Sequence, residues 1–400
     1  MLSLEEAQAA IVDGMVAASE AETVDLAQAH LRYLAESVAA TVDNPAFDNS
    51  AMDGYAVNTE QLVGAGFRLP RIGESSAGDA PGILSPDSTM RIFTGAPLPD
   101  GADAVVIQED IRIEDDEVVF PHTVQPGQNI RPRGQDFQRG DSLFDTGRRV
   151  SAFDAALLAA AGVARVSVFR RPRVLVIATG NELVAPGSPL KPGQIYESNR
   201  QATLLMAGQL GADVIDGGTV RDDPDAVRDV LKNSMDYDFV ISSGGVSVGD
   251  YDLVKQVFAE IGDINFWKVR IKPGKPVAFG RLGERCNFFG LPGNPVSSLV
   301  TFYLFVQPAL LAWHHGSATP LSLKASATTS YRRHAGRTEF LRARLESNDG
   351  NLRVTPLPGQ GSHMLGTLRD TNALIRLEHD VEGFAAGDTL SVIPLSTDIS

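Results

Sequence analysis

Residues 172–312 alternate continuous apolar runs with amphipathic ones, and this alternation limits the fold more than any other feature of the chain. Runs such as RVLVIATG (173–180) and DFVISSGG (238–245) are apolar up to their ends, as expected of strands that are buried on both faces. Segments such as SNRQATLLMAGQLGA (198–212) and DPDAVRDVLKNSM (223–235) have helical spacing. The alternation predicts a parallel α/β sheet with helices on both faces, whose binding site lies at the carboxyl ends of the strands.

The rest of the chain divides into three further parts. Residues 1–45 and 145–171 are predicted to form a discontinuous, helical N-terminal region, because 3–42 is Ala-rich with helical apolar spacing. Residues 46–144 are rich in Gly, Pro and short β-type runs, which indicates an irregular β-rich second domain. Residues 323–400 alternate apolar and polar positions and are predicted to form a small C-terminal β-barrel after an α/β domain at 172–318. The predicted fold class is therefore α/β plus β, multidomain.

The composition excludes several classes of partner. The chain of 400 residues has a formal net charge of −15, whereas a nucleic-acid footprint or a polybasic membrane contact needs a basic surface. The N-terminus lacks the basic and apolar regions of a signal peptide, and the single cysteine, Cys286, suits a reducing compartment. The apolar run 297–313 is interrupted by Gln307 and Pro308, so we expect a buried helix there. We expect a cytoplasmic protein without nucleic-acid or membrane partners.

Polar residues follow the predicted strands in four loops, ATGNEL (178–183), TVRDDP (219–224), SSGGVSVGDYD (242–252) and LPGNPVSS (291–298). Glycines let a backbone approach a ligand, and the first amides of a helix favour an anion. Taken singly, each acidic residue has an equally good structural explanation: Glu182 and Asp250 as first-turn residues that favour the helix dipole, and Asp223 as an N-cap, which for that residue we prefer. Because four such loops meet at one edge of the sheet, we interpret them together as a ligand site.

The stretch FWKVRIKPGKP (266–276) gathers positive charge in an acidic chain. It holds four cations in eight residues, at Lys268, Arg270, Lys272 and Lys275. A charge run is usually a solvated face, but the first three cations alternate at period two and would share one side of a strand. We interpret this stretch as a rigid cationic strip for an anionic ligand.

Cations for oxyanions, carboxylates for a divalent metal and Gly-rich amide loops together suggest phosphoryl or nucleotidyl chemistry. The sequence has no P-loop pattern G-x-x-x-x-G-K-[ST] and no G-x-G-x-x-G pattern. Its seven histidines show no zinc-binding spacing, and no Ser/His/Asp constellation is legible. From its chemistry alone, Asp53 before Gly54 reads as a turn residue.

Eight stretches together resemble one family. They are NSAMDGYAV, TGAPLPDGADAVV, RPRGQDF, ATGNEL, GQIYESNR, SSGGVSVGDYD, IKPGKPVAFG and GLPGNPVSS. This set resembles molybdopterin molybdenumtransferases of the bacterial MoeA type, which are similar to the C-terminal domain of gephyrin. The likeness runs from about residue 5 to about residue 395, and the motifs occur in order. In two places the chain departs from the pattern, because Asn181 and Glu197 stand where Asp is more frequent.

The resemblance implies an activity. The family takes adenylylated molybdopterin and molybdate, cleaves the AMP linkage with Mg²⁺ or another divalent cation, and inserts molybdenum into the dithiolene. By the same likeness the metal carboxylates are Glu182, Asp222 and Asp252. These three also count among the catalytic positions that the resemblance implies, with Asp53, Thr94, Lys268, Lys272, Arg342 and Ser362. Asp53 thereby changes from a turn residue to a site residue, on the strength of the likeness alone.

The resemblance also implies a set of pterin- and phosphate-binding positions. These are Thr179, Gly180, Ser198, Asn199, Ser243, Gly244, Gly245, Ser247, Gly293, Asn294, Pro295 and Ser297. Members of the family are homodimers in which the α/β domain of one subunit and the second domain of the other share a site. The likeness further implies contacts with the adenylyltransferase that supplies the substrate and with the apo-molybdoenzymes that receive the product.

Three other functions compete with this interpretation. A non-catalytic molybdopterin-binding scaffold would use the same fold, but the complete set of acidic and basic positions disfavours it. A tungsten-inserting enzyme would need the same residues, because tungstate and molybdate are tetrahedral dianions of similar size. A generic nucleotide hydrolase would turn over free nucleotide without pterin and is the weakest of the three.

Overall fold

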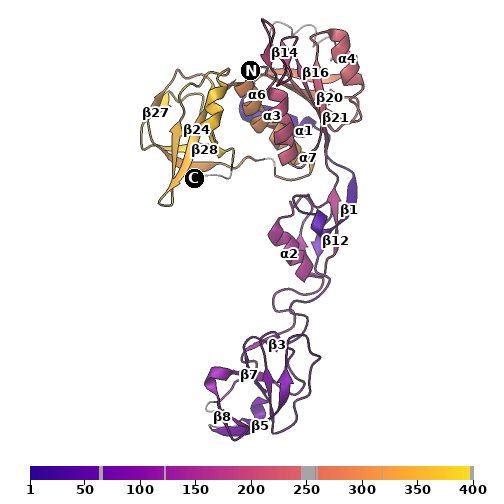
Figure 1. The fold of residues 1–400 in the computed structure, drawn as a ribbon, viewed down its shortest axis with the longest axis vertical. Helices are drawn as coiled ribbons and strands as arrows, with labels where there is room; N and C mark the ends of the chain where they lie inside the picture. The colour runs from indigo at the N-terminus through magenta and orange to yellow at the C-terminus, as the bar shows by residue number, and fades with distance from the viewer. Residues whose placement is uncertain (63–65, 121–122, 245–256, 258–259, 318, 397–400) are drawn as a thin grey trace. The chain divides into compact units, whose positions relative to one another are not determined.

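A computed structural model describes residues 1–62, 66–120, 123–244, 257, 260–317 and 319–396. These residues form two compact units (Figure 1). The larger unit holds residues 1–22, 31–33 and 169–400, and the smaller unit holds residues 23–30 and 34–168. The predicted α/β and C-terminal domains both lie in the larger unit, and the predicted second domain lies in the smaller one.

The core of the larger unit is a six-stranded sheet with the order β16-β13-β17-β21-β20-β18. The strands are β13 (Arg173–Thr179), β16 (Asp213–Val220), β17 (Phe239–Ser243), β18 (Gly262–Lys268), β20 (Pro276–Leu282) and β21 (Cys286–Leu291). The first four in this order are parallel, as predicted, but β20 and β18 are antiparallel additions at one edge. The chain from β20 to β21 is far too short for a parallel crossover, so these two strands form a hairpin.

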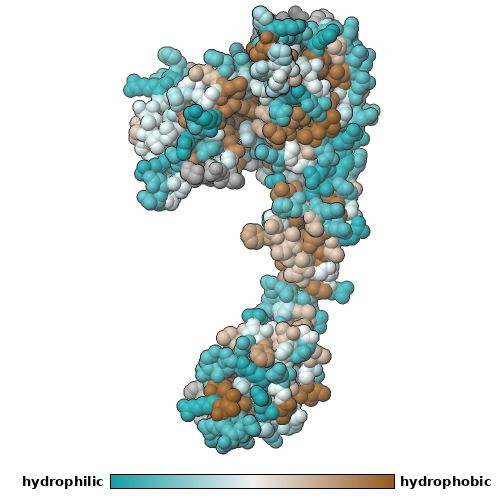
Figure 2. Space-filling view, in the orientation of Figure 1, coloured by the Kyte–Doolittle hydropathy of each residue, from teal (hydrophilic) through white to brown (hydrophobic). Residues whose placement is uncertain are grey.

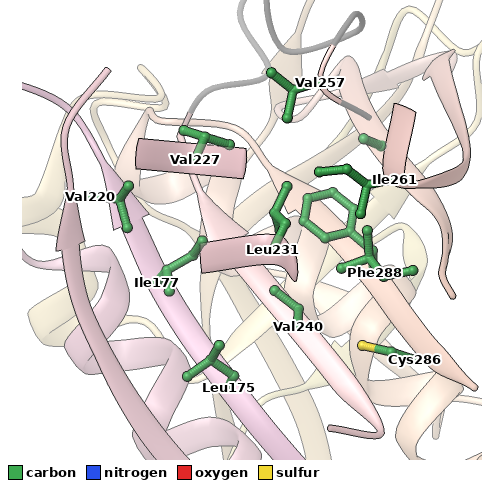
Figure 3. Close-up of a cluster of buried hydrophobic side chains, with 12 residues drawn as sticks. Leu175, Ile177, Val220, Val227, Leu231, Val240, Val257, Ile261, Cys286 and Phe288 are labelled. Carbon is green, nitrogen blue, oxygen red and sulfur yellow. The ribbon is translucent and has the colours of Figure 1, made fainter. Parts of the chain in front are cut away.

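Helices cover both faces of this sheet. Val227 and Leu231 of α4 (Pro224–Lys232) pack on Leu175, Ile177 and Val240 of the strands (Figure 3). On the other face, Phe239 meets Trp313 of α7 (Gln307–Trp313), with 6.3 Å between ring centroids. Successive strand residues point to opposite faces of the sheet, so Phe239 packs against one helical layer and Val240 against the other. Buried Cys286 lies among the apolar side chains, and burial raises the pKa of its thiol to about 12.

The predicted helix near residues 297–313 is a nineteen-residue helical stretch, Pro295–Trp313, with 72% of its most apolar window buried. It consists of α6 (Pro295–Thr301), a π-helical turn η4 (Phe302–Val306) and α7. Among the described helices it alone is long and apolar enough to cross a membrane, by length and composition only. It packs with α1 (Leu4–Gly14) and α3 (Asn199–Gln209) in the core of the larger unit.

The C-terminal part of the larger unit is a closed barrel of five strands, β24-β25-β22-β28-β26, as the alternating sequence predicts. Its strands are β22 (Leu323–Ala327), β24 (Thr338–Asn348), β25 (Asn351–Pro356), β26 (Ala373–Leu377) and β28 (Thr389–Pro394), with a short ladder of β23 (Tyr331–Arg332) and β27 (Gly383–Phe384) beside it. A sixth strand, β19 (Ile271–Lys272), comes from the α/β domain and pairs in parallel with β24. This pairing ties the two domains together.

The cationic stretch is not one strand. Lys268 ends β18 of the α/β sheet, whereas Lys272 lies in β19 of the barrel sheet. The alternation itself is kept, because the three cations at 268, 270 and 272 are exposed while Val269 and Ile271 are buried. The stretch therefore passes from one sheet to the other.

The smaller unit contains a six-stranded sheet of order β7-β4-β6-β5-β9-β8. Its strands are β4 (Gly54–Val57), β5 (Phe67–Ser75), β6 (Thr89–Ile92), β7 (Ala104–Ile107), β8 (Arg112–Glu114) and β9 (Glu117–Phe120). Short pairs join β3 (Asn49–Ser50) to β10 (Ile130–Arg131) and β2 (Val38–Ala39) to β11 (Ser142–Phe144). Within the predicted helical segment 145–171 lies α2 (Ala152–Ala160), which begins with a capping box between Ser151 and Asp154.

The predicted helix over 3–42 is wrong beyond its first third. Only α1 is α-helical, and it starts at the Ser3–Glu6 capping box and ends before an extended Met15. Residues Ala21–Asp25 form strand β1, which pairs with β12 (Arg165–Phe169), and Leu26–Gln28 form a single 3₁₀ turn. Helix propensity is a weak preference, and here pairing with a distant strand satisfies the backbone instead.

Candidate functional site

A cavity of about 880 Å³ lies where the strand ends of the α/β domain face the C-terminal barrel. Its volume falls in the range of small-molecule and cofactor sites. One side, which we call the strand-end wall, consists of Thr179, Glu182, Ser198, Asn199, Ser243, Gly244, residues 292–295 and Ser297. The other side, which we call the basic wall, consists of Lys272, Lys275, Arg337 and residues 360–363. The two walls differ in origin and in charge.

The strand-end wall requires glycine at its centre. Gly244 follows β17 with a φ of +93°, and a Cβ there would lie 2.7 Å from the carbonyl oxygen of Thr179. Any side chain would therefore push β13 and β17 apart at the mouth of the site. Beside it, the buried Oγ1 of Thr179 has no hydrogen-bond partner among the described residues. Gly180 is next to this wall but does not line the cavity.

Carboxylates approach the strand-end wall from two neighbouring loops. Glu182 is exposed and lines the cavity. Asp222 lies on the loop after β16, and its backbone N–H donates to Oδ1 of Asn181 at 3.3 Å, which brings the two loops together. Asp252, with Gly245 and Ser247, lies outside the described residues. Within the described ranges, no three His, Cys, Asp or Glu side chains gather as a metal site.

The donors near the cavity nevertheless suit a hard divalent cation. Glu182 and the unpartnered hydroxyl of Thr179 offer oxygen atoms only, which are the ligands that Mg²⁺ takes in proteins. Neither sulfur nor imidazole comes with them from the strand-end wall. The ligand atoms of Glu182 and Thr179 are therefore of the type that magnesium prefers.

The start of the long helix closes the floor of the cavity. Asn199 donates from Nδ2 to the carbonyl oxygen of Gly293 at 2.8 Å, which joins two of the predicted loops. We predicted free amides at this helix start, but the backbone N–H of Val296 already donates to the carbonyl oxygen of Ser362 at 3.1 Å. One amide therefore holds the C-terminal loop in place, and Ser362 is fixed beside residues 293–297.

The basic wall is organised by a buried carboxylate that the sequence did not single out. Glu339 is 2% exposed, and its Oε1 lies 2.6 Å from Nζ of Lys272. The register of β19 and β24 places these two residues opposite each other. Lys272 and Lys275 line the cavity, whereas Lys268, three residues before β19, does not. The predicted role of Lys268 remains untested by this geometry.

Arg342 lies behind the basic wall. It is 1% exposed and donates from Nη1 and Nη2 to the carbonyl oxygens of Gly359 and Gly361 at 2.6 to 3.2 Å. Its Nε is buried without a hydrogen-bond partner among the described residues, and burial lowers the pKa of its guanidinium. In this geometry Arg342 shapes the loop that carries Gln360, Gly361 and Ser362 and does not itself line the cavity.

Asp53 and Thr94 lie together in the smaller unit. Oδ1 of Asp53 accepts from both the backbone N–H and the Oγ1 of Thr94, each at 2.8 Å. These hydrogen bonds, the backbone one first, hold the pKa of Asp53 below its usual value. The result is a fixed, ionised carboxylate on an accessible loop.

The cavity thus brings together most of the residues predicted from the sequence. Twelve of them line it, namely Thr179, Glu182, Ser198, Asn199, Ser243, Gly244, Lys272, Gly293, Asn294, Pro295, Ser297 and Ser362. The residues that our sequence analysis missed include Glu197, Arg337, Gln360 and His363. Of these, Gln360 and His363 lie within two residues of the predicted Ser362, and Glu197 lies in the motif GQIYESNR, where it is buried and pairs with Arg200.

Three family descriptions match the chain in order. They are "MoeA N-terminal region (domain I and II)" over residues 2–162, "Probable molybdopterin binding domain" over residues 175–312 and "MoeA C-terminal region (domain IV)" over residues 324–395. The cavity lies between the parts of the chain that match the second and third of these.

Full-length relatives carry one name. A molybdopterin molybdenumtransferase of Haemophilus influenzae is 39% identical over 99% of both chains. One of Bacillus subtilis is 35% identical over 94% of this chain and 90% of its own. A crystal structure of a molybdopterin biosynthesis MoeA protein from Pyrococcus horikoshii matches with a TM-score of 0.84 at 28% identity, over 98% of this chain and all of the other.

Proposed function

The chain belongs to the molybdopterin molybdenumtransferases, the transferases of molybdenum cofactor biosynthesis, and on this premise we propose how its site works. The substrate is adenylylated molybdopterin, and the second substrate is molybdate. The protein cleaves the AMP linkage, releases AMP and leaves molybdenum in the dithiolene. The observation that carries this proposal is the division of one cavity into a strand-end wall with a carboxylate and a basic wall with three cations.

The strand-end wall is proposed to hold the adenylyl and pterin phosphate groups. The hydroxyls of Ser243 and Ser297 are donors for phosphate oxygens, while the backbone N–H of Gly244 already donates to the carbonyl oxygen of Leu291 at 3.0 Å. Glu182, Asp222 and Asp252 would hold a divalent cation, Mg²⁺ by preference for oxygen ligands, which supplies neutralisation of charge between the phosphates. Two observations support this metal site: Glu182 lines the cavity, and Asp222 lies on the adjoining loop.

The basic wall is proposed to bind molybdate. Lys272 presents an ammonium group that is already aligned by Glu339, and an ammonium with three N–H donors can serve a carboxylate and an oxyanion together. Ser362 supplies a hydroxyl on a loop that Arg342 and the Val296 amide hold in place. Fixed donors bind an oxyanion better than mobile ones, because less ordering is needed on binding.

We further propose a homodimer whose sites combine both subunits. Helix α2 supports an interface, because only Asp154 and Leu158 of its residues are buried and Phe153 is 88% exposed. Hydrophobic residues gather over this helix in the space-filling view (Figure 2). An apolar helix face in water is a typical contact surface. In the dimer, Asp53 and Thr94 of the smaller unit would complete the cavity of the other subunit.

Subunit complementation tests the shared site. Asp53→Asn and Lys272→Met are each expected to be inactive, and in a shared site a mixed dimer keeps one intact cavity. Co-expression with two different tags should therefore restore about one quarter of wild-type activity by random pairing. Isolated mixed dimers that stay as inactive as the parents would place both residues in a site within one subunit and contradict the proposal.

The reaction itself is tested by AMP release from adenylylated molybdopterin with Mg²⁺, with and without molybdate. Release that depends on molybdate, with reconstitution of an apo-molybdoenzyme, is the expected result and places the reaction before the cofactor's recipients. The cytoplasm is the proposed compartment. Tungstate in place of molybdate shows which oxyanion is preferred. Tight substrate binding without any release would instead support a molybdopterin-binding scaffold that passes its ligand from the adenylyltransferase onward.

A further inference from the structure

A second cavity adjoins the basic wall. It has a volume of about 510 Å³ and is lined by Lys272, Tyr331 and residues 332–337. Lys272 and Arg337 line both cavities, so the two spaces share a wall. Four of the side chains in this small lining are Lys or Arg, in a chain whose net charge is −15. Such a concentration of positive charge attracts anions.

Not all of this charge is available to a ligand. The guanidinium of Arg333 is 4% exposed and donates to the carbonyl oxygens of Arg337, Glu378 and Val381. It also lies 3.6 Å from Oε2 of Glu339. Glu339 thus offsets the charges of Arg333 and Lys272 from beneath the wall. The charges of Arg333 and Lys272 are therefore partly neutralised, and the other cations of the lining carry the charge that is available to a ligand.

Arg337 and Arg332 are the uncompensated cations. No ion pair joins either to a carboxylate within the ranges that the structure describes. Arg337 is half-buried, and its Nη1 lies 3.5 Å from the carbonyl oxygen of Ile271, a contact too long to satisfy the group. A guanidinium held in this way keeps most of its donors for a planar contact with an oxyanion.

We propose that the second cavity binds a tetrahedral oxyanion, with Arg337 as the principal ligand and Arg332 at its rim. When a large adenylylated pterin fills the first cavity, the second still gives an oxyanion access to Lys272 through the shared wall. Glu339 is the positioning residue that keeps Lys272 at that wall. The inference deepens the proposed function and depends on it for the identity of the oxyanion as molybdate.

The test compares Arg337→Met, Arg337→Lys and Arg332→Met with Arg353→Met. Arg353 is an exposed cation of the same barrel that lines neither cavity, so the control makes the same change of charge. Molybdate is titrated into each purified full-length protein by calorimetry, with sulfate and phosphate as separate arms. The molybdate dependence of AMP release is measured in parallel, so that KM for molybdate and kcat are obtained separately.

Arg337→Met is expected to raise Kd and KM for molybdate about 10- to 100-fold, as for the loss of a charge-assisted hydrogen bond. Arg332→Met should raise them about threefold, in keeping with an exposed charge. Arg337→Lys should recover part of the loss, and Arg353→Met should match the wild type. Equal weakening for sulfate, phosphate and molybdate would support a general oxyanion site, and selective weakening for molybdate would support a dedicated one.

Two results would overturn the proposal. Molybdate binding by Arg337→Met that equals the wild type removes Arg337 as a ligand. Weakened binding by Arg337→Met beside a fully unchanged Arg332→Met confines the oxyanion to the first cavity. Failure of the proposed function looks different, because the wild type would then bind oxyanions without any molybdate-dependent release of AMP.

Discussion

The two walls of the cavity are built in different ways. The strand-end wall comes from loops that follow parallel strands of one sheet, and hydrogen bonds such as Asn199 to Gly293 join those loops directly. The basic wall comes from two domains, and it is assembled by the pairing of β19 with β24 and by the ion pair of Lys272 with Glu339. The first wall follows from local topology, whereas the second depends on docking.

This difference separates two kinds of residue. On the strand-end wall, polar side chains face the cavity and few buried charges support them. On the basic wall, two groups are supported by buried residues: Glu339 pairs with Lys272, and Arg342 holds the loop of Ser362. We infer that changes to the polar side chains of the strand-end wall affect chemistry with little loss of stability, while changes to the supported groups of the basic wall affect both.

The largest expected effect is at Glu182. Glu182→Gln removes the described carboxylate of the strand-end wall, and AMP release should fall about 10²-fold or more, as for other preorganised electrostatic groups. The side chain is exposed and makes no ion pair with the described residues, so the thermal midpoint should stay near the wild type. The measurement is kcat for AMP release over a range of Mg²⁺ concentrations. Full activity of Glu182→Gln at every Mg²⁺ concentration would show that the strand-end wall does not supply a catalytic carboxylate at Glu182.

Arg342→Met should combine instability with a binding defect. It leaves the carbonyl oxygens of Gly359 and Gly361 without their buried donors, at about 1–3 kcal/mol for each unsatisfied group. Thermal and denaturant unfolding should show the loss, and KM for molybdate should rise because the loop of Ser362 is no longer held. A variant of unchanged stability that lost its response to molybdate would instead make Arg342 a direct ligand.

The smallest effect is expected at Asp223, next to Asp222. Its side chain accepts from the backbone N–H of Asp225 at 3.2 Å and caps α4. Asp223→Ala should lower the free energy of unfolding by about 1 kcal/mol and leave kcat unchanged. Asp222→Asn is the matched variant, for which activity should fall and stability should hold. This result would assign helix capping to Asp223 and a role in the reaction to Asp222. Loss of activity in Asp223→Ala with loss of stability in Asp222→Asn would exchange the two roles.

The sequence predicted the strand-end wall because its logic is local. Apolar strands, the helix cap at Asp223 and Gly-rich strand ends all lie within short windows. Parallel strands then bring their carboxyl ends to one edge without further information. The same reasoning failed over residues 15–42, where a strand partner more than a hundred residues away decides the structure.

The basic wall could not be predicted from the sequence alone for a related reason. Glu339 and Arg337 lie in or beside a strand whose alternating pattern indicates only a β-barrel. Their roles arise from the register of Lys272 opposite Glu339, across 67 positions of sequence. The family resemblance named Arg342 and Ser362, but the contacts that set their roles appear only in the folded chain.

A crystal structure of the protein soaked with AMP, Mg²⁺ and tungstate tests the division of the cavity most directly, because tungsten is located by its anomalous scattering. The account predicts a tungsten peak within hydrogen-bonding distance of Lys272 and Arg337, with the phosphate of AMP at Ser243 and Gly244. A peak among residues 293–297 of the strand-end wall, with no density at the basic wall, would contradict it.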